Sequence, residues 1–425
     1  MTDTAKILPK LRFPEFENDG GWKVVKFKDI FTMLSNNTLS RAELSEQDGI
    51  ALNIHYGDVL IKFGERLDLN TDNLPHIKDD EILYKYKSSY LKDGDVIFAD
   101  TAEDETAGKC TEIRNIGKQI VISGLHTIPC RPKNEFAPYY LGYYLNSNAY
   151  HTKLLPLMQG AKVTSISRSS LQETIVVYPP SLPEQQKIAA FLTSLDEQIS
   201  AHTKKLEALK AHKKGLMQQL FPANGEKTPK LRFPEFKNDG EWNFANGDKL
   251  FKPIVNKQHS SDLPVLAITQ EQGAVPREMI DYNVIVSDKS IENYKIVEIG
   301  DFIISLRSFQ GGIEYSHYKG LCSPAYIVLR KTNDNVCDEY YRHYFKSHQY
   351  IQDLNRNLEG IRDGKMVSYK QFSEIKIPHP SYIEQQKIAS FLSSIDEMIQ
   401  AQDDKIQKLK TYKNGLMQQM FVMSK

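Results

Sequence analysis

The chain has 425 residues, of which 40% are hydrophobic, and its 54 basic and 54 acidic residues give a formal net charge of zero. The length predicts two to four domains, and the hydrophobic content argues against an intrinsically disordered chain. Balanced charge argues against non-specific polyanion binding, but it leaves specific nucleic-acid contacts through local patches open. The sequence holds no apolar run of about 18 residues, so no membrane span is expected.

The first residues of the chain and its cysteines indicate the cellular compartment in which we expect the protein. The first ten residues, MTDTAKILPK, lack the charged-then-apolar pattern of a signal peptide. Cys110, Cys130, Cys322 and Cys337 fall in no C-x-x-C spacing. In a chain of this length, that favours reduced thiols and a cytoplasmic location.

A short segment near the start of the chain is repeated later. KLRFPEFENDGGW occupies residues 10–22 and KLRFPEFKNDGEW occupies residues 230–242, with 11 of 13 positions identical at an offset of 220. We call these the A segments. Their Phe and Trp residues are expected to be apolar anchors, and their Asn-Asp-Gly is expected to form a turn.

Each A segment is followed by a divergent stretch, residues 23–180 and residues 243–380, and the two stretches share an order of features. In each, a Gly-Asp pair precedes an apolar strand, at Gly94 and at Gly300, and a polar loop containing glycine follows. This order predicts the same α/β fold twice, with different surfaces. The later shared features are strands at 119–130 and 322–330, Tyr-rich helices at 137–150 and 338–350, and strands ending in prolines at 173–180 and 373–380.

Each divergent stretch is followed by a 41-residue segment, 181–221 and 381–421, and 24 of the 41 positions are identical. We call these the B segments. Their apolar residues recur with the 4-3-4-3 spacing of a coiled coil, with polar residues at the same two seam positions, His202 and Lys213 in one copy, Gln402 and Lys413 in the other. The predicted apolar seam consists of Ile188, Leu192, Leu195, Ile199, Leu206, Leu209, Leu216, Ile388, Leu392, Ile395, Ile399, Ile406, Leu409 and Leu416.

The B segments also carry signals for helix ends. Ser181 with Glu184, and Ser381 with Glu384, fit the S-x-x-E capping box. Pro222 is expected to end the first helix. A helix of about 39 residues would span roughly 58 Å.

A narrow heptad stripe needs a partner helix. The matched length and phase favour pairing of the two B helices within one chain, with the polar positions fixing the register. Two separate arms that oligomerise the protein are the alternative. Connectivity favours an antiparallel pair, in which each A segment lies near the end of the other copy's helix and the divergent stretches lie at opposite ends of a pseudo-two-fold rod.

Polar loops in the divergent stretches are candidates for DNA contact, with a solvated surface loop as the alternative. Residues 159–170 and 358–370 combine Gly with Ser, Thr, Arg and Lys, which contact phosphates and base edges. Residues 307–312 carry Arg and Gln, which read guanine and adenine. Their counterpart at 101–109 is acidic, so only Lys109 is expected to contact DNA there. The predicted DNA-binding residues are Lys109, Lys162, Thr164, Ser165, Ser167, Arg168, Arg307, Ser308, Gln310, Arg362, Lys365, Tyr369 and Lys370.

The sequence carries no complete motif for catalysis or metal binding. YPPS at 178–181 lacks the acid or amide and the aromatic residue that flank the prolines in an adenine methyltransferase. TAGKC at 106–110 lacks the first Gly and the Ser/Thr of a P-loop. HExxH and a compact His/Cys cluster are both missing. We expect a binding protein with no catalytic site and no metal site.

This layout, with EQQKIAxFL at 184–192 and 384–392 and GLMQQ at 215–219 and 415–419, resembles the specificity subunit of type I restriction-modification systems over essentially the whole chain. The resemblance implies an α/β fold class, with two pseudo-symmetric α/β target recognition domains joined by two long antiparallel coiled-coil helices. It implies a non-catalytic subunit whose domains each read one half of a bipartite asymmetric site in double-stranded DNA, while the helices set the spacing.

The resemblance also implies partners. The repeated segments would dock two methyltransferase (modification) subunits, and two restriction/translocase subunits would join them, with no membrane partner. S-adenosylmethionine, ATP and Mg would bind to those partners, and no cofactor would bind to this chain. The modification subunit would flip the target adenine out of the stack.

Two other functions stay open. One is a scaffold of two ligand-binding modules on a coiled-coil rod, which the zero net charge favours. The other is an enzyme with a nuclease site formed by the acids at 100–105 near Lys109. The expected domain limits are 1–22 for the first A segment, 23–180 for the first recognition domain, 181–221 for the first helix, 222–242 for the linker with the second A segment, 243–380 for the second recognition domain and 381–421 for the second helix.

Overall fold

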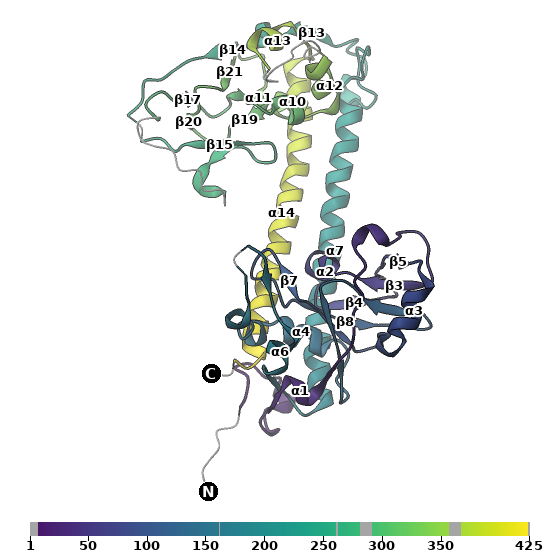
Figure 1. Cartoon of the computed structure of the whole chain (residues 1–425). Coiled ribbons are helices and arrows are strands. Elements are labelled where there is room, and N and C mark those ends of the chain that lie inside the picture. The colour runs from purple at the N-terminus through teal and green to yellow at the C-terminus, as the bar shows by residue number, and fades with distance from the viewer. Residues whose placement is uncertain (1–6, 161, 261, 281–290, 357–366, 424–425) are drawn as a thin grey trace. The chain divides into compact units, whose positions relative to one another are not determined.

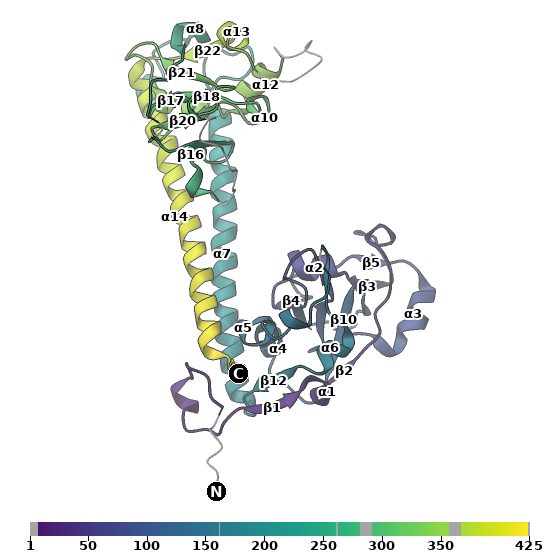
Figure 2. The ribbon, with the colours of Figure 1, turned by 60° about the vertical axis from the view of Figure 1, so that its left-hand side comes forward.

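The structure is a computed structural model that describes residues 7–160, 162–260, 262–280, 291–356 and 367–423. The chain forms two compact units: the first combines Met1–His202 with Lys405–Lys425, and the second is Thr203–Asp404. Each unit contains one α/β domain and one half of each long helix (Figures 1 and 2). We describe each unit by itself.

The strands of the first unit form a five-stranded sheet and three smaller sheets. The strands are β1 (Lys23–Lys26), β2 (Phe31–Met33), β3 (Ala51–Ile54), β4 (Arg66–Asp68), β5 (His76–Ile77), β6 (Val96–Ala99), β7 (Thr101–Ala102), β8 (Cys110–Arg114), β9 (Val121–Ser123), β10 (Thr127–Pro132), β11 (Thr164–Ser165) and β12 (Ile175–Tyr178). The main sheet has the order β2-β10-β6-β8-β4, with only the β4–β8 pair parallel. The smaller sheets are β5-β3-β9, β1-β12 and β7-β11.

The helices of the first unit are short apart from the B helix. They are α1 (Phe27–Ile30), α2 (Tyr56–Ile61), α3 (Asp80–Tyr86), α4 (Tyr140–Asn146), α5 (Asn148–His151) and α6 (Arg168–Gln172), with 3-10 turns at Pro14–Phe16, Arg41–Glu43, Lys87–Ser89 and Leu155–Leu157. The predicted Tyr-rich helix is therefore two helices. The break is at Ser147, which has an extended backbone (φ -67°, ψ 151°) and whose hydroxyl donates to the carbonyl of Tyr144.

The second unit repeats this plan with a smaller main sheet, of order β14-β21-β18-β19. Its strands are β13 (Asn243–Asn246), β14 (Phe251–Ile254), β15 (Leu266–Thr269), β16 (Gly273–Pro276), β17 (Lys295–Val297), β18 (Phe302–Ile304), β19 (Glu314–Tyr315), β20 (Gly320–Cys322), β21 (Ile327–Lys331) and β22 (Lys376–His379). Its short helices are α8 (Gly247–Leu250), α10 (Ser308–Gly311), α11 (Asp338–Tyr344), α12 (His348–Arg356) and α13 (Tyr369–Glu374), with 3-10 turns at Pro234–Phe236 and Arg277–Met279. The pairs β13-β22, β15-β16 and β17-β20 complete it.

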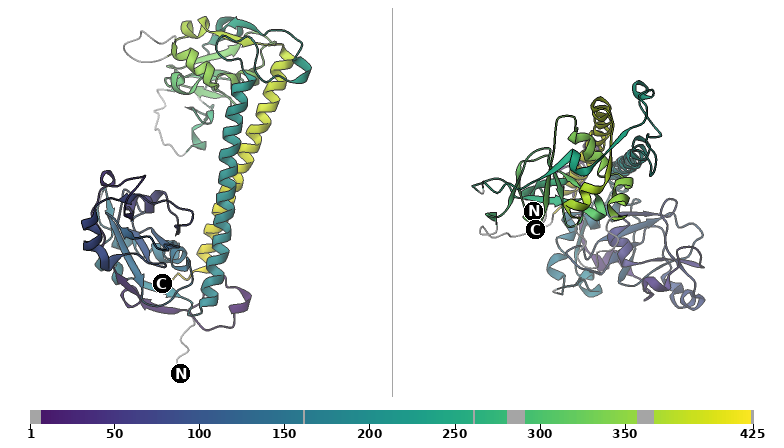
Figure 3. Two further views of the ribbon diagram at one scale, coloured as in Figure 1. Left: turned by 90° about the vertical axis from the view of Figure 1, so that its right-hand side faces the viewer. Right: turned by 90° about the horizontal axis from the view of Figure 1, so that it is seen from above.

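The two long helices are α7 (Leu182–Leu220) and α14 (Tyr382–Met420), and each has 39 residues. In the first unit the start of α7 packs against the end of α14, and in the second unit the end of α7 packs against the start of α14 (Figure 3). The predicted antiparallel pair within one chain is therefore confirmed. Every predicted seam residue is buried or half-buried. In the described part of the chain, no helix is long and apolar enough to cross a membrane.

Lysines at the polar seam positions bridge the two helices. In the first unit, Lys413 donates to Asp196 at 2.7 Å and to Glu65 at 2.9 Å. In the second unit, Lys213 of α7 pairs with Asp396 of α14. The two Lys–Asp pairs are reciprocal, and a shift of either helix would separate both pairs, so these positions fix the register.

The A segments tie the start of one helix to the end of the other. Arg12 donates to both carboxylate oxygens of Glu184, each at 2.7 Å, while the Leu11 N–H donates to the Gln419 carbonyl at 2.9 Å. This confirms the predicted place of the first A segment, and the second repeats it with Arg232, Glu384, Leu231 and Gln219. We call the Arg12–Glu184 and Arg232–Glu384 pairs the Arg–Glu clamps.

The clamps change the interpretation of the predicted capping boxes. The Glu184 N–H donates to the Ser181 hydroxyl at 3.4 Å, as expected, but the Glu184 carboxylate binds Arg12 instead of the Ser181 backbone. The same holds for Glu384 with Ser381 and Arg232. Only half of each predicted box forms, because an arginine far away in the sequence offers a stronger, charge-assisted pairing.

Candidate nucleic-acid interface

The predicted DNA loop at 159–170 is joined to the acidic loop of the first unit. β11, in the first loop, pairs with β7, in the second, and the Ile166 N–H donates to the Asp100 carbonyl at 2.8 Å. Lys162 is exposed, and Thr164 and Ser165 are half-buried. The two loops therefore form one continuous edge that carries both basic and acidic residues.

Two predicted contacts in this loop have structural partners of their own. The Ser167 hydroxyl accepts from the Ser170 N–H at 3.0 Å and caps α6. Arg168 donates to the Leu34 carbonyl and to the Asn36 side chain, both at 2.8 Å. These residues hold the loop in place, which leaves Lys162 as its exposed cation.

The acidic loop is more ordered than its composition suggests. The Asp104 carboxylate accepts from the Thr106 hydroxyl and from the Thr106 N–H, and these two hydrogen bonds hold the pKa of Asp104 below its usual value. Lys109 is exposed, and its carbonyl accepts from the Ala99 N–H at 2.8 Å. Asp100 accepts from the Thr101 hydroxyl at 2.8 Å and lies beside His126.

The matching loop of the second unit presents Arg307 and Gln310, which are both exposed. Ser308 is buried, and its hydroxyl accepts from the Ser305 N–H at 2.8 Å, so the structure places this predicted contact inside the fold. The Gln270 side chain, at the end of β15, donates to the Arg307 carbonyl at 3.1 Å. The β15–β16 hairpin thus supports the exposed loop.

The last predicted loop is described only in part. Arg362 and Lys365 lie outside the described residues. The Tyr369 hydroxyl donates to the Phe251 carbonyl at 3.1 Å, which gives this side chain a structural role, while Lys370 is exposed. Burial raises the pKa of Tyr369, so its hydroxyl remains a hydrogen-bond donor.

Buried charges in both units hold the sheets together. Arg131 donates to Asp95 at 2.9 and 2.7 Å, and Arg330 donates to Asp301 at 2.6 and 2.7 Å. Burial raises the pKa of Asp95, which Arg131 opposes. In each unit the pair joins neighbouring strands of the main sheet, so these carboxylates are structural.

The described residues offer little for covalent or metal chemistry. All four cysteines are unpaired and buried, and burial raises the pKa of each thiol. A thiol with a raised pKa is a poor nucleophile at neutral pH. No group of three His, Cys, Asp or Glu side chains within the described ranges could hold a metal ion.

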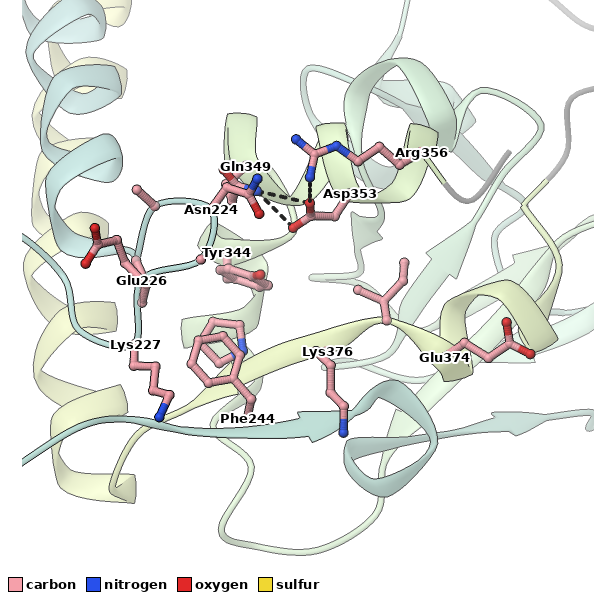
Figure 4. Close-up of a pocket in the computed structure, with 15 residues that line it drawn as sticks. Asn224, Glu226, Lys227, Phe244, Tyr344, Gln349, Asp353, Arg356, Glu374 and Lys376 are labelled. Carbon is pink, nitrogen blue, oxygen red and sulfur yellow. Dashed lines mark hydrogen bonds and ion pairs between the residues drawn. The ribbon is translucent and has the colours of Figure 1, made fainter. Parts of the chain in front are cut away.

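A cavity of about 570 Å³ in the second unit lies among the linker after α7, strands β13 and β22, and helices α11 and α12 (Figure 4). Phe244, Lys227 and Lys376 line one side, while Asp353 on another side accepts from Gln349 at 3.0 and 3.1 Å. Mixed charge suits a phosphate backbone poorly. In the first unit the residues at the same places in the β1–β12 pair are Val24 and Ile175, so this lining occurs in one unit only. It therefore does not fit a partner that binds both units in the same way.

Comparison with known proteins shows the family to which the chain belongs. A family model described as "Type I restriction modification DNA specificity domain" matches residues 19–211 and again residues 217–411. The chain belongs to this family.

Specificity subunits of two type I restriction enzymes from Methanocaldococcus jannaschii are similar in sequence. The chain assigned to MjaX is 26% identical over 414 residues, which cover 93% of this chain and 92% of that one. The MjaVIII subunit is 23% identical over 266 residues, which cover 58% of this chain and 61% of that one. The specificity family is the non-catalytic, DNA-recognising component of type I systems, so the nuclease alternative is not retained.

Two solved structures share the fold of this specificity subunit. The S subunit from M. genitalium is 14% identical, with coverage of 99% of this chain and 100% of that chain and a TM-score of 0.55. A chain from a structure describing complex assembly and conformational transition of a type I system is 18% identical, with coverage of 95% and 98% and a TM-score of 0.51. The predicted fold class is confirmed.

Sequence analysis missed several side chains at these edges. In the first unit the Tyr56 ring packs against His55 and His126, and His126 lies beside Asp100, while in the second unit Gln270 supports the loop. The available signal was the Gly-x-His turn between two strands at 124–126. The sequence predicts one strand over 119–130, so this turn lies outside the loops expected to contact DNA.

Proposed function

We propose that the chain reads a bipartite, asymmetric site in double-stranded DNA, with each unit reading one half. One observation carries this proposal: matching Arg–Glu clamps and seam lysine pairs are found in both units, yet the side chains after the equivalent strands β6 and β18 differ. Arg307 and Gln310 follow β18, whereas Asp100 and the His126 turn occupy the equivalent edge beside β6. Two edges of different chemistry suit two different half-sites.

We further propose that the repeated segments dock two copies of a modification subunit. Gln186, Glu197 and Gln218 are exposed on α7, and the residues 200 positions later on α14 are identical and exposed. Exposed side chains contribute little to packing of the chain itself. Identity at such positions is expected where two identical partners bind equivalent surfaces.

Gly215 and Gly415 support the same docking surface. Each lies inside a long helix, and a Cβ added to either would meet nothing within 4 Å. Glycine in a helix interior costs about 1 kcal/mol relative to alanine. Because the chain gains no close packing from either glycine, we assign both to the close approach of a partner.

In this proposal two restriction/translocase subunits join the modification subunits, and the assembly works in the cytoplasm. S-adenosylmethionine, ATP and Mg are bound by the partners, and the methyltransferase flips its target base. The role of this chain is to position those partners on a chosen sequence.

We also propose that the long helices set the gap between the half-sites. Inserting one heptad at matched positions of α7 and α14 would keep the seam in phase and lengthen the pair by about 10 Å. That length corresponds to about three base pairs of B-DNA. The recognised gap should therefore grow by about three unspecified base pairs, and an unchanged gap would show that the helices do not set it.

The function is tested by co-expressing the chain with modification subunits and sequencing the methylated sites of the host. We expect co-purification, and methylation of one split, non-palindromic sequence that disappears when the gene is deleted. A chain that co-purifies with modification subunits but leaves the methylated sequence unchanged on deletion would refute DNA recognition. Failure to co-purify would refute the docking role.

A further inference from the structure

One turn of the first unit is strained around an exposed imidazole. His126 lies between β9 and β10 with a φ of 54°, in the left-handed region that residues other than glycine rarely adopt. Its side chain is 49% exposed, so core packing does not explain the strain. Residues with a strained backbone are concentrated at binding sites, so the exposed His126 ring is a candidate for contact with a ligand.

Asp100 fixes the orientation of this ring. His126 Nδ1 lies 3.3 Å from the Asp100 carboxylate, which also accepts from the Thr101 hydroxyl, and the Asp100 N–H donates to the His126 carbonyl at 3.1 Å. A carboxylate only accepts hydrogen bonds, so the proton of the neutral imidazole is on Nδ1. The lone pair is then on Nε2.

Aromatic rings support the other side of the turn. The Tyr56 ring packs edge-to-face with His126 at a centroid distance of 5.4 Å, and the His55 ring lies 4.6 Å from Tyr56. His55 is held in turn, because its Nδ1 accepts from the Gly57 N–H at 3.2 Å. His126 is thus oriented by a carboxylate and by a fixed aromatic neighbour, as a recognition side chain requires.

The turn lies beside a loop that the sequence predicts to contact DNA. The Asp100 carbonyl accepts from the Ile166 N–H, which joins the turn to the loop that carries Lys162. Three acids follow Asp100 closely in the chain, Glu103, Asp104 and Glu105, and negative charge there disfavours a phosphate. Nε2 of His126 is a hydrogen-bond acceptor, so the partner that suits it in an acidic setting is a hydrogen-bond donor. In the major groove, the amino groups of the bases are such donors.

We propose that His126, oriented by Asp100, reads one base of the half-site bound by the first unit. Nε2 accepts a hydrogen bond from an exocyclic amino group in the major groove, N4 of cytosine or N6 of adenine. The proposal rests on the proposed function, to which it adds a named residue and a base chemistry.

The test uses His126→Gly, with Asn115→Gly as the matched control. Asn115 is exposed and also left-handed, with a φ of 60°. Glycine fits both backbones with less strain, so both variants should fold. Each is assembled with modification subunits, and methylation is measured on a library in which every position of both half-sites is varied.

We expect His126→Gly to lose preference for cytosine or adenine at one position of one half-site, by about tenfold, as for one lost base contact. The base for which preference is lost, cytosine or adenine, shows which amino group Nε2 binds. The other half-site and the Asn115→Gly profile should not change. Asp100→Asn should affect the same position, because it removes the carboxylate that orients the ring.

Two results would overturn the inference. An unchanged profile for His126→Gly would mean that the ring reads no base, and an equal loss on every sequence would assign it to the backbone. Failure of the proposed function looks different, because the wild-type assembly would then show no sequence preference in the library.

Discussion

The two units share an interior and differ at their edges. In the first, Phe421 at the end of α14 packs on Tyr140 and Tyr144, with ring centroids 6.0 and 5.6 Å apart. In the second, Phe221 at the end of α7 packs on Tyr340 and Tyr344, at 5.6 and 5.4 Å. The main sheets, by contrast, have five and four strands. Residues that face the helix pair are held in common, and residues that face outward have been free to change.

The shared interior also contains one difference that bears on stability. Lys413 in the first unit is bonded to Asp196 and to Glu65 and lies over the Tyr143 ring, whereas Lys213 in the second unit pairs with Asp396. The Lys413 side chain is 8% exposed and that of Lys213 is 20% exposed. The seam lysine is therefore anchored to its domain more firmly in the first unit, whereas in the second unit it is Asp396 that lies beside domain residues, Arg342 and His343.

The largest expected effect tests whether the Arg–Glu clamps are equivalent. Glu184→Ala and Glu384→Ala should each lower the free energy of unfolding by about 3 kcal/mol, because each leaves a buried arginine without its partner. The loss at Glu184 should be somewhat greater, since the Trp22 ring N–H also donates to it. Urea denaturation of the two variants measures both values.

Glu15→Ala is the control for the clamps, because its exposed pairing with Lys187 should add nothing measurable. A clamp variant that matches this control would show that its unit does not depend on the A segment.

A second effect tests the difference between the seam lysines. Lys413→Met should cost about 2 kcal/mol, because it leaves Asp196 and Glu65 without their shared cation. Lys213→Met should cost about 1 kcal/mol or less, because its pair is more exposed. Equal losses in thermal denaturation would contradict the firmer anchoring of the first unit.

A third comparison separates Arg168, which holds the loop at 159–170 in place, from Lys162, which is proposed to contact DNA. Arg168→Ala should lower stability by about 1 kcal/mol, since it removes hydrogen bonds to Leu34 and Asn36. Lys162→Ala should leave stability unchanged, weaken DNA binding equally on all sequences, and reduce the salt-dependence slope by about one. Binding isotherms at several salt concentrations test this. Sequence-selective loss with Lys162→Ala would contradict its assignment to phosphate.

The smallest effect is expected at the two helix glycines, where substitution should raise the stability of the chain but weaken its assembly with partners. Gly215→Ala and Gly415→Ala should each stabilise the isolated chain by roughly 0.5–1 kcal/mol, because alanine favours the helix and meets open space. Both should weaken assembly with modification subunits, since the added methyl groups occupy the contact surface. Unchanged assembly in a titration with those subunits would remove the glycines from the docking surface.

The sequence predicted the interior better than the edges, for physical reasons. Heptad spacing is a local property, so the seam could be predicted from the B segments alone, and the connectivity of the chain added the antiparallel direction. The pairing of Arg12 with Glu184 joins residues far apart in the sequence, and no local pattern reveals it. The loops at the edges of the domains were harder to predict. Their composition does not show that Asp100 orients His126, or that Ser167 and Arg168 bind their own unit. Such pairings depend on which loops the sheet brings together.

The central claim, that each unit reads its own half-site, is tested most directly by exchange. Residues 243–380 are replaced by the corresponding stretch of another family member, with both A segments and both B segments retained, and the methylated sites are sequenced. The account predicts that one half of the recognised sequence changes while the other half and the gap stay the same. A change in both halves would contradict it.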